Sequence, residues 1–178
     1  MRIGIVSDTH VPEAGKVLPK QMYDALKGVD LIMHAGDMHV VDVLDWLGEI
    51  APVIGARGNG DGGPLRPPFP KNDPRVKDAH IVEAAGVVVG LTHGFLLPDE
   101  HPWTTREDLM ERKLGRRVDV IVCRDTHLAY LGCHNGILYV NPGSPNNPRH
   151  LNALGQVAFL TLERGMATAQ IIELAGWR

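Results

Sequence analysis

Short apolar runs alternate with segments of helical periodicity in the first third of the chain. Runs at 2–7 (RIGIVS), 30–35 (DLIMHA) and 52–55 (PVIG) predict three strands. Between these runs, apolar residues recur at helical spacing after Pro19 and again over 40–47, which predicts two helices. An alternation of strands and helices is typical of parallel strands joined by crossover helices.

The rest of the chain is richer in hairpin signals. Asn135-Gly136 is a strong two-residue turn signal, and Ala85-Gly86 and the segment around Glu163-Arg164-Gly165 also predict turns. A helix is predicted over 104–114, with Thr104 or Thr105 as its N-cap. The glycine- and proline-rich stretch 62–74 reads as an irregular surface loop. The remaining strand-like runs are 80–84, 87–92, 118–123, 128–133, 136–141, 155–162 and 166–174. We therefore expect an α/β fold in which helices cover two packed sheets.

Composition narrows the class of protein. A chain of 178 residues with 44% hydrophobic and 22% charged residues predicts one globular domain over 1–178. The formal net charge of −3 gives no electrostatic reason to expect nucleic-acid binding, and no apolar run is long enough to span a membrane. Two cysteines make no disulfide framework, and the N-terminus lacks a leader-like segment, so we expect a cytoplasmic setting.

Five predicted strands end in residues that can bind a metal ion. In α/β sheets, ligand sites lie outside the carboxyl ends of parallel strands, so these side chains are expected to converge. Any single Asp or His here is more often a turn, cap or surface residue, and Asn59 between two glycines is most simply a turn. The repetition at five strand ends favours a shared site. The residues are Asp8 and His10, Asp37, Asn59 and Asp61, His93, and Asp125 and His127.

The residue types indicate which metals are expected. Mixed carboxylate and imidazole ligands suit Mn, Fe, Zn or Ni better than Mg alone. Without Asp61, seven of these side chains remain; they exceed the needs of one four-coordinate ion, whereas two ions that share a bridging carboxylate would use all seven.

Taken together in order, these motifs resemble those of the calcineurin-like metallophosphoesterase superfamily, in particular its small bacterial and archaeal phosphodiesterases. The pattern runs Asp-x-His, Gly-Asp, Gly-Asn-[His or Cys]-Asp, Thr-His-Gly and Gly-His-Thr-His. In this chain, Asn141-Pro142-Gly143-Ser144 resembles a further block of those small proteins. The resemblance implies a four-layer α/β/β/α sandwich of two mixed β-sheets. The matching segments here are Asp8-Thr9-His10, Gly36-Asp37, Gly58-Asn59-Gly60-Asp61, Thr92-His93-Gly94 and Arg124-Asp125-Thr126-His127.

The resemblance also implies the chemistry. A hydroxide that bridges two divalent ions, Mn²⁺ foremost and Ni²⁺, Fe, Zn²⁺ or Mg²⁺ as alternatives, would hydrolyse a small phosphodiester or phosphomonoester. Asn59 would stabilise charge on the phosphoryl oxygens and Asp61 would position a ligand or its loop. A homodimer is raised by resemblance only. The first ion would be held by Asp8, His10, Asp37 and His127, and the second by Asp37, Asn59, His93 and Asp125.

Three positions depart from the pattern. Asp125 stands where the family has His. Its carboxylate would add a hard oxygen ligand and a negative charge to the second site, which favours Mn²⁺ or Mg²⁺ there. Gly60 stands where the wider superfamily has a His that protonates the leaving group, and His39 is the nearest replacement in sequence. Phe95 replaces a second His found in many relatives.

A different class of function stays open at this point. Some proteins that resemble this chain, including a retromer subunit, use the fold for protein contacts. The changes at Asp125 and Gly60 favour such a weakly active or inactive scaffold, whereas retention of the other six ligand types favours an enzyme. We therefore expect a hydrolase of phosphoric esters, with the scaffold as the alternative.

Overall fold

The computed structural model describes residues 1–63, 66, 69, 72–95, 105–124 and 126–176, and they include two mixed β-sheets. The first sheet joins the front of the chain to its end, with strand order β11-β10-β1-β2-β3-β4. Strands β1 to β4 run parallel, β10 pairs antiparallel with β1, and β11 pairs antiparallel with β10. The bounds are β1 Arg2–Val6, β2 Leu31–His34, β3 Val53–Ala56, β4 Val76–Lys77, β10 Gln156–Glu163 and β11 Met166–Glu173.

The second sheet has the order β5-β6-β7-β9-β8. Its three central strands, β6, β7 and β9, are parallel, and each edge strand pairs antiparallel with its neighbour. The bounds are β5 Ala79–Ala84, β6 Val87–Thr92, β7 Val120–Val122, β8 Tyr130–His134 and β9 Ile137–Asn141.

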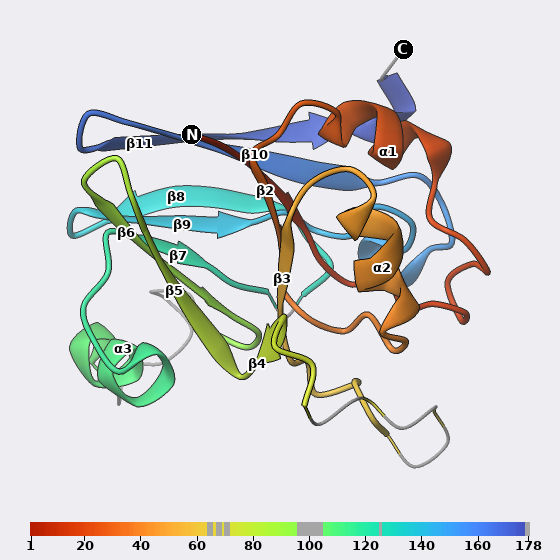
Figure 1. The fold of residues 1–178 in the computed structure, drawn as a ribbon, viewed down its shortest axis with the longest axis horizontal. Coiled ribbons are helices and arrows are strands. Elements are labelled where there is room, and N and C mark those ends of the chain that lie inside the picture. The colour runs from red at the N-terminus through yellow and green to blue at the C-terminus, as the bar shows by residue number, and fades with distance from the viewer. Residues whose placement is uncertain (64–65, 67–68, 70–71, 96–104, 125, 177–178) are drawn as a thin grey trace.

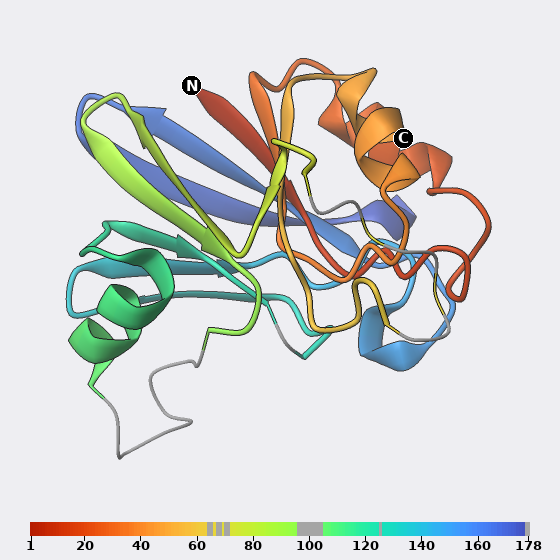
Figure 2. The same cartoon turned by 60° about the horizontal axis from the view of Figure 1, so that its bottom comes forward.

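Helices form the two outer layers. Helices α1 (Lys20–Leu26) and α2 (Asp42–Gly48) pack on the first sheet, and α3 (Arg106–Leu114) packs on the second. Figure 2 shows α1 and α2 on one side of the paired sheets and α3 on the opposite side. The expected four-layer α/β/β/α sandwich is therefore confirmed. Two short 3₁₀ helices, Pro148–His150 and Leu174–Gly176, complete the regular elements.

Alternation along the strands builds both cores. Ile3 and Ile5 point into the core between the sheets, whereas Val6 belongs to the core beneath α1 and α2. Neighbouring residues of β2 divide in the same way, with Ile32 under the helices and Met33 between the sheets. Because successive side chains of a strand point to opposite faces, a strand covered on both sides is apolar throughout.

Helix α3 has the ends that its sequence predicts. The Thr105 side chain accepts a hydrogen bond from the backbone N–H of Asp108 at 3.2 Å, and Glu107 and Asp108 lie in the first turn. The helix stops at Gly115, whose φ is 72°. Met110 and Leu114 are buried against the second sheet.

Differences from the expected elements are small. The two-residue strand β4 was not predicted, because it is too short to show alternation. The hairpin at Asn135-Gly136 has the expected two-residue loop, with φ of 51° and 76°. Among the described residues, no helix combines the length and apolar character needed to cross a membrane.

Candidate metal centre

Loops from both sheets meet at one site. The loops after β1, β2 and β3 come from the first sheet, and those after β6 and β7 come from the second (Figures 1 and 2). Within each sheet these strands are parallel neighbours, so their carboxyl ends share one edge. The predicted convergence is therefore observed for Asp8, His10, Asp37, Asn59, His93 and His127, while Asp125 lies outside the described residues.

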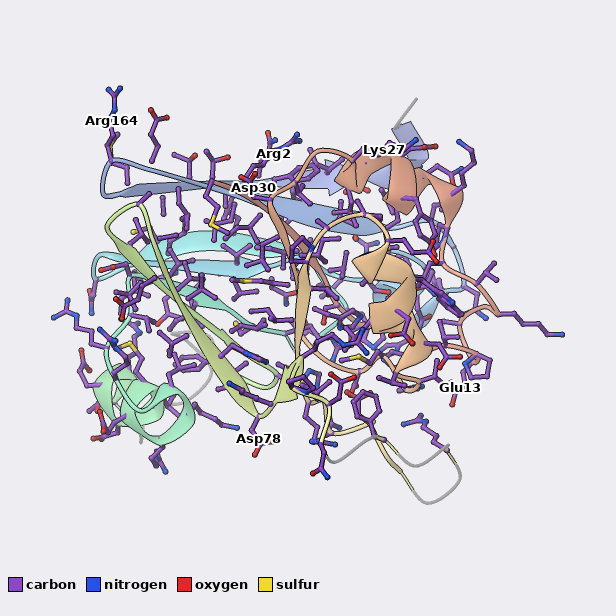
Figure 3. The ribbon with its side chains drawn as sticks, in the orientation of Figure 1. Arg2, Glu13, Lys27, Asp30, Asp78 and Arg164 are labelled. Atoms are coloured by element: carbon purple, nitrogen blue, oxygen red, sulfur yellow. The ribbon has the colours of Figure 1, made fainter. Side chains whose placement is uncertain are left out.

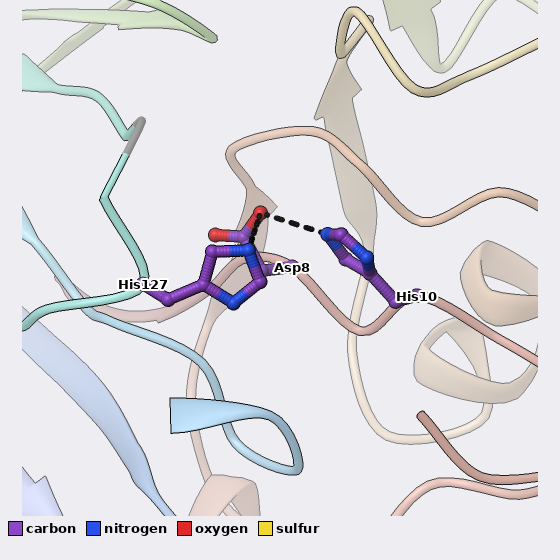
Figure 4. Close-up of side chains that lie close together, drawn as sticks. All are labelled: Asp8, His10 and His127. Carbon is purple, nitrogen blue, oxygen red and sulfur yellow. Dashed lines mark hydrogen bonds and ion pairs between the residues drawn. The ribbon is translucent and has the colours of Figure 1, made fainter. Parts of the chain in front are cut away.

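One group of candidate ligands surrounds Asp8, which is fully buried. Its Oδ1 lies 3.4 Å from Nε2 of His10 and 4.0 Å from Nε2 of His127 (Figure 4). Each of the three residues offers one ligand atom, and these atoms lie within 4.8 Å of one another. Asp37 approaches the same group, with its Oδ2 at 3.6 Å from Nε2 of His10.

A second group of donors shares Asp37. Its other oxygen, Oδ1, lies 3.6 Å from Nε2 of His93. Nε2 of His93 is in turn 2.7 Å from Oδ1 of Asn59. The two carboxylate oxygens of Asp37 thus face different imidazoles, one in each group.

Hydrogen bonds fix the orientation of two imidazoles. Nδ1 of His93 donates to the carbonyl oxygen of Ala35 at 2.7 Å, and Nδ1 of His127 donates to that of Asn147 at 2.9 Å. In a neutral ring with its proton on Nδ1, Nε2 carries the lone pair that can bind a metal ion. Such a backbone bond on the far nitrogen is the usual support of a metal-binding His, so the donor chemistry fits divalent metal ions.

The surroundings of His10 and His127 lower the pKa of both imidazoles. Burial, followed by the nearby His39, lowers the pKa of His10 to about 4. Burial, followed by the Arg124 charge, lowers the pKa of His127 to about 4. Both rings are therefore neutral near pH 7, which is the form that binds a metal ion.

The backbone is unusual at the same residues. Asp8, His10, Asp37 and His127 have φ between 43° and 56°, in the left-handed region that non-glycine residues rarely adopt. Such backbone strain is tolerated where the surrounding structure imposes it, and it clusters at functional sites. The strain accompanies the ligand side chains from both sheets.

Asp61 ties the loops of the first sheet together. Its Oδ2 accepts hydrogen bonds from the backbone N–H groups of Gly58 and Asp37 at 2.8 and 3.2 Å, and its Oδ1 accepts from His39 N–H at 2.7 Å. Gly58 permits this close approach, because a Cβ at that position would lie 2.1 Å from Oδ1 of Asp37. Asp61 thereby holds the loop after β3 against the loop after β2.

His39 lies beside this centre and not on the surface. Its side chain is 1% exposed, and its ring centroid is 4.2 Å from that of His10. Nδ1 bonds to Oε2 of Glu13 at 2.8 Å, while Nε2 has no hydrogen-bond partner among the described residues. A Cβ at Gly60 would lie 2.8 Å from this Nε2, so the ring borders the space that a larger residue would fill.

Sequence reasoning missed Glu13, whose importance depends on contacts across the fold. Glu13, which is labelled in Figure 3, also accepts a hydrogen bond from Nε of Arg66 at 3.0 Å. Partial burial acts to raise the pKa of Glu13, but the hydrogen bonds from His39 and Arg66 lower it to about 2. The carboxylate therefore stays charged beside the imidazole.

Sequence reasoning did not predict that Arg124 pairs with the carboxylates of this centre. The motif offered one signal, because the family pattern has Gly at that position. The side chain is 3% exposed. Its Nε forms an ion pair with Oδ2 of Asp8, and its Nη1 lies 3.9 Å from Oδ2 of Asp37. The guanidinium thus contacts carboxylates of the first donor group.

The remaining sequence signals have structural roles. Phe95 is buried and packs near Tyr139, with ring centroids 6.2 Å apart. Ser144 donates from its hydroxyl to the backbone oxygen of Asp8 at 2.8 Å, and Asn146 donates to that of Thr9 at 2.8 Å. The segment after β9 therefore braces the loop that carries Asp8.

A cleft of about 720 Å³ opens beside the second donor group. Asn59 and His93 lie on its wall, and Arg57 together with Arg112 and Lys113 of α3 makes the wall basic. The acidic residue there, Asp78, lies between β4 and β5 (Figure 3), and its carboxylate is 3.7 Å from Nε of Arg57.

Comparisons with known proteins agree with this geometry. A sequence profile of the calcineurin-like phosphoesterase superfamily domain matches residues 1–165. A probable metallophosphoesterase of Methanocaldococcus jannaschii is 34% identical over 151 residues, which cover 84% of this chain and 70% of that protein. Vps29 of Chaetomium thermophilum has a TM-score of 0.71 at 17% identity, over 97% of this chain and 95% of that one. The structure of an archaeal phosphodiesterase has a TM-score of 0.64 at 20% identity, over 97% of this chain and 100% of that one. The two structures establish the fold alone.

Proposed function

Because this chain belongs to the calcineurin-like phosphoesterase superfamily, we propose that it is a phosphodiesterase that uses two divalent metal ions. The observation that carries the proposal is the position of Asp37. Its two carboxylate oxygens each lie 3.6 Å from the Nε2 atom of a different imidazole, His10 on one side and His93 on the other. A carboxylate placed in this way is suited to bridge two ions.

Each ion has its own set of ligands in this proposal. Asp8, His10 and His127 would hold the first together with Asp37, and Asn59 and His93 would hold the second. Asp125 remains our candidate for a further ligand of the second ion. When bound, the ions would supply a water of lowered pKa and stabilise negative charge on the phosphoryl oxygens. Mn²⁺ is the foremost candidate, because the donors mix carboxylate, amide and imidazole.

The remaining polar residues divide the other tasks. Asn59 borders the cleft, where its amide can donate a hydrogen bond to a phosphoryl oxygen. Nε2 of His39 would give a proton to the leaving oxygen, while Glu13 holds the ring in place through Nδ1. His39 also belongs to a group of potential ligand atoms with His10 and Asp37, so its role is tested separately below.

The cleft suggests what kind of substrate enters. Arg57, Arg112 and Lys113 place three cationic groups on its wall, whereas Asp78 contributes one carboxylate. Such a wall favours an ester that carries negative charge beyond the reacting phosphate. We propose a small phosphodiester with a second anionic group as the preferred substrate.

Metal content and turnover together test the main proposal. We expect the protein saturated with Mn²⁺ to hold two ions per chain and to hydrolyse bis-p-nitrophenyl phosphate. Asp37→Asn should weaken binding of both ions and reduce turnover by at least about 100-fold. Asp45→Asn, which removes the same charge from an exposed position on α2, should change neither. Absence of bound metal and of turnover across a range of divalent ions would contradict the proposal.

A scaffold function is the second candidate. It is favoured by the similarity of the fold to that of Vps29 and by the Arg124 guanidinium at the carboxylates of the donor group. The same assay separates the two, because a scaffold gives no metal-dependent turnover while its fold stays intact.

A further inference from the structure

Arg124 brings a positive charge into the metal centre. It lies two residues after the end of β7, and its side chain is 3% exposed. The guanidinium pairs with Oδ2 of Asp8 and lies 3.9 Å from Oδ2 of Asp37. These two carboxylates are themselves buried, at 0% and 8% exposure of their side chains.

Buried carboxylates need compensation. Leaving an ionised carboxylate unpaired in the interior is strongly destabilising, whereas an ion pair with good geometry offsets much of that cost. Arg remains charged at all physiological pH values, and its planar group can contact two carboxylates at once. Arg124 therefore supplies these carboxylates with charge compensation of the kind that a metal ion would supply.

We propose that Arg124 is an internal competitor of the metal ions, which pairs with Asp8 and Asp37 in the metal-free protein and leaves that pair when a cation binds. The inference rests on the proposed function, since it takes Asp8 and Asp37 as metal ligands. Two effects prevent the Arg124 guanidinium and a divalent ion from binding these carboxylates at the same time. The guanidinium and a divalent ion repel each other at short range in a poorly solvated site, and they draw on the same carboxylates.

The competition has two consequences. Pairing of Arg124 with the carboxylates and binding of the metal ion are coupled, and such coupling is reciprocal. The free energy by which a bound ion weakens the Arg124 pair therefore equals the free energy by which that pair weakens binding of the ion. The metal-free fold is kept stable, and the concentration of metal needed for occupancy is raised. The Gly found at this position in the family pattern has no side chain that could compete.

Metal affinity of matched variants tests the inference. We would titrate metal-free protein with Mn²⁺ by calorimetry for wild type, Arg124→Gln, Arg124→Lys and Arg116→Gln. Arg124→Gln removes the competing charge and should bind Mn²⁺ at least about tenfold more tightly than wild type. Arg124→Lys keeps the charge and should stay nearer to wild type. Arg116→Gln removes an exposed charge that pairs with Glu83 and should leave the affinity unchanged.

Thermal unfolding provides a second readout. Without metal, Arg124→Gln should unfold at a lower temperature than wild type, because Asp8 and Asp37 lose their counter-charge. Saturating Mn²⁺ should raise its unfolding temperature by more than that of wild type. Equal or weaker metal affinity of Arg124→Gln, with wild type still binding metal, would overturn the inference alone. Failure of wild type and all variants to bind metal would overturn the proposed function and the inference together.

The wild-type protein also permits a direct test, should Arg124→Gln fail to fold without metal. Arginine Nε–H resonances can be followed by ¹⁵N NMR during a titration with diamagnetic Zn²⁺ or Mg²⁺, and Arg124→Lys identifies the Arg124 signal. We expect this resonance to shift and lose protection from solvent exchange as metal binds. A resonance that keeps its position and protection at saturation would show that the guanidinium stays in place, and would overturn the inference.

Discussion

The Nδ1 atom of His39 lies 2.8 Å from Oε2 of Glu13, so an imidazole next to the candidate metal centre is held by a carboxylate. The opposite nitrogen, Nε2, borders the space left by the missing side chain of Gly60. This relationship gives the centre a candidate proton donor although the residue expected to provide one is a glycine.

The first prediction concerns the leaving group. His39→Ala should slow hydrolysis of diesters with alkyl or phenyl leaving groups by roughly 10²–10⁴-fold, because an alkoxide or a phenoxide is a poor leaving group unless it receives a proton. With p-nitrophenolate, which leaves unprotonated, the loss should be below about tenfold. Rates measured over a series of leaving groups of different pKa check this.

Two further variants make this test specific. Glu13→Gln should give a smaller loss in the same direction, because Nδ1 of the ring keeps a hydrogen-bond partner, although that partner is no longer a carboxylate. His134→Ala changes an imidazole that pairs with Tyr130 and should have no effect. Equal losses for every leaving group, together with weaker metal binding, would identify His39 as a ligand instead of a proton donor.

The second prediction concerns stability. Asp61→Ala would leave three backbone N–H groups, those of Asp37, His39 and Gly58, without their acceptor. We expect the free energy of unfolding to fall by about 2–4 kcal/mol, measured by urea denaturation of the metal-free protein. Asp45→Ala, at an exposed ion pair, should cost less than about 1 kcal/mol. Similar values for the two variants would show that Asp61 does not hold the loops.

The third prediction is a pH dependence of stability without metal. The folded protein lowers the pKa of His10 and of His127 from 6.5 to about 4, in both cases chiefly through burial. Between these values the unfolded chain binds protons that the folded chain does not. The free energy of unfolding should therefore decrease as the pH falls through this window, by about 1.4 kcal/mol per pH unit for each ring.

Urea denaturation in the presence of a chelator, at pH 7 and pH 5, measures this dependence. His34 adds to it, because complete burial lowers its pKa to about 3. Replacing His127 by Gln removes one of the three rings and should make the dependence shallower. Equal stability at the two pH values would contradict the prediction.

The fourth prediction concerns substrate selection by the cleft. Replacing Arg112 and Lys113 together by Gln removes two positive charges from its wall. For a p-nitrophenyl diester that carries an additional phosphate, KM should rise by about tenfold, as expected for two exposed charges. For bis-p-nitrophenyl phosphate, KM should change little.

Ionic strength and a distant charge provide the controls for the cleft. Added salt should reduce the difference between the two substrates in wild type, because it screens exposed charges. Lys27→Gln, at the residue that follows α1 and lies away from the cleft, should leave both KM values unchanged (Figure 3). An equal rise of KM for both substrates would show that the cleft does not select for the second charge.

The sequence by itself determined the order of the elements and the chemistry at their ends. Short continuous apolar runs predicted the strands, because a strand buried on both faces is apolar throughout, and their alternation with helical segments predicted that the strands are parallel. The capping residue Thr105 and the turn at Asn135-Gly136 are local signals, and both are confirmed. The types and order of the candidate ligands were also predicted from the sequence, because a residue can bind a metal ion only if its side chain carries a donor atom, and the sequence shows which residues do.

Tertiary structure decided which of these side chains meet. The contacts of His39 with Glu13 and of Arg124 with Asp8 join loops far apart in the chain, so no local pattern reports them. The first contact arises because β1 and β2 are parallel neighbours in one sheet, so the loops that follow them lie side by side. The second arises because the two sheets pack face to face and bring the end of β7 against that of β1. Sequence patterns record which face of an element is buried, whereas the partner across that face depends on how the layers pack.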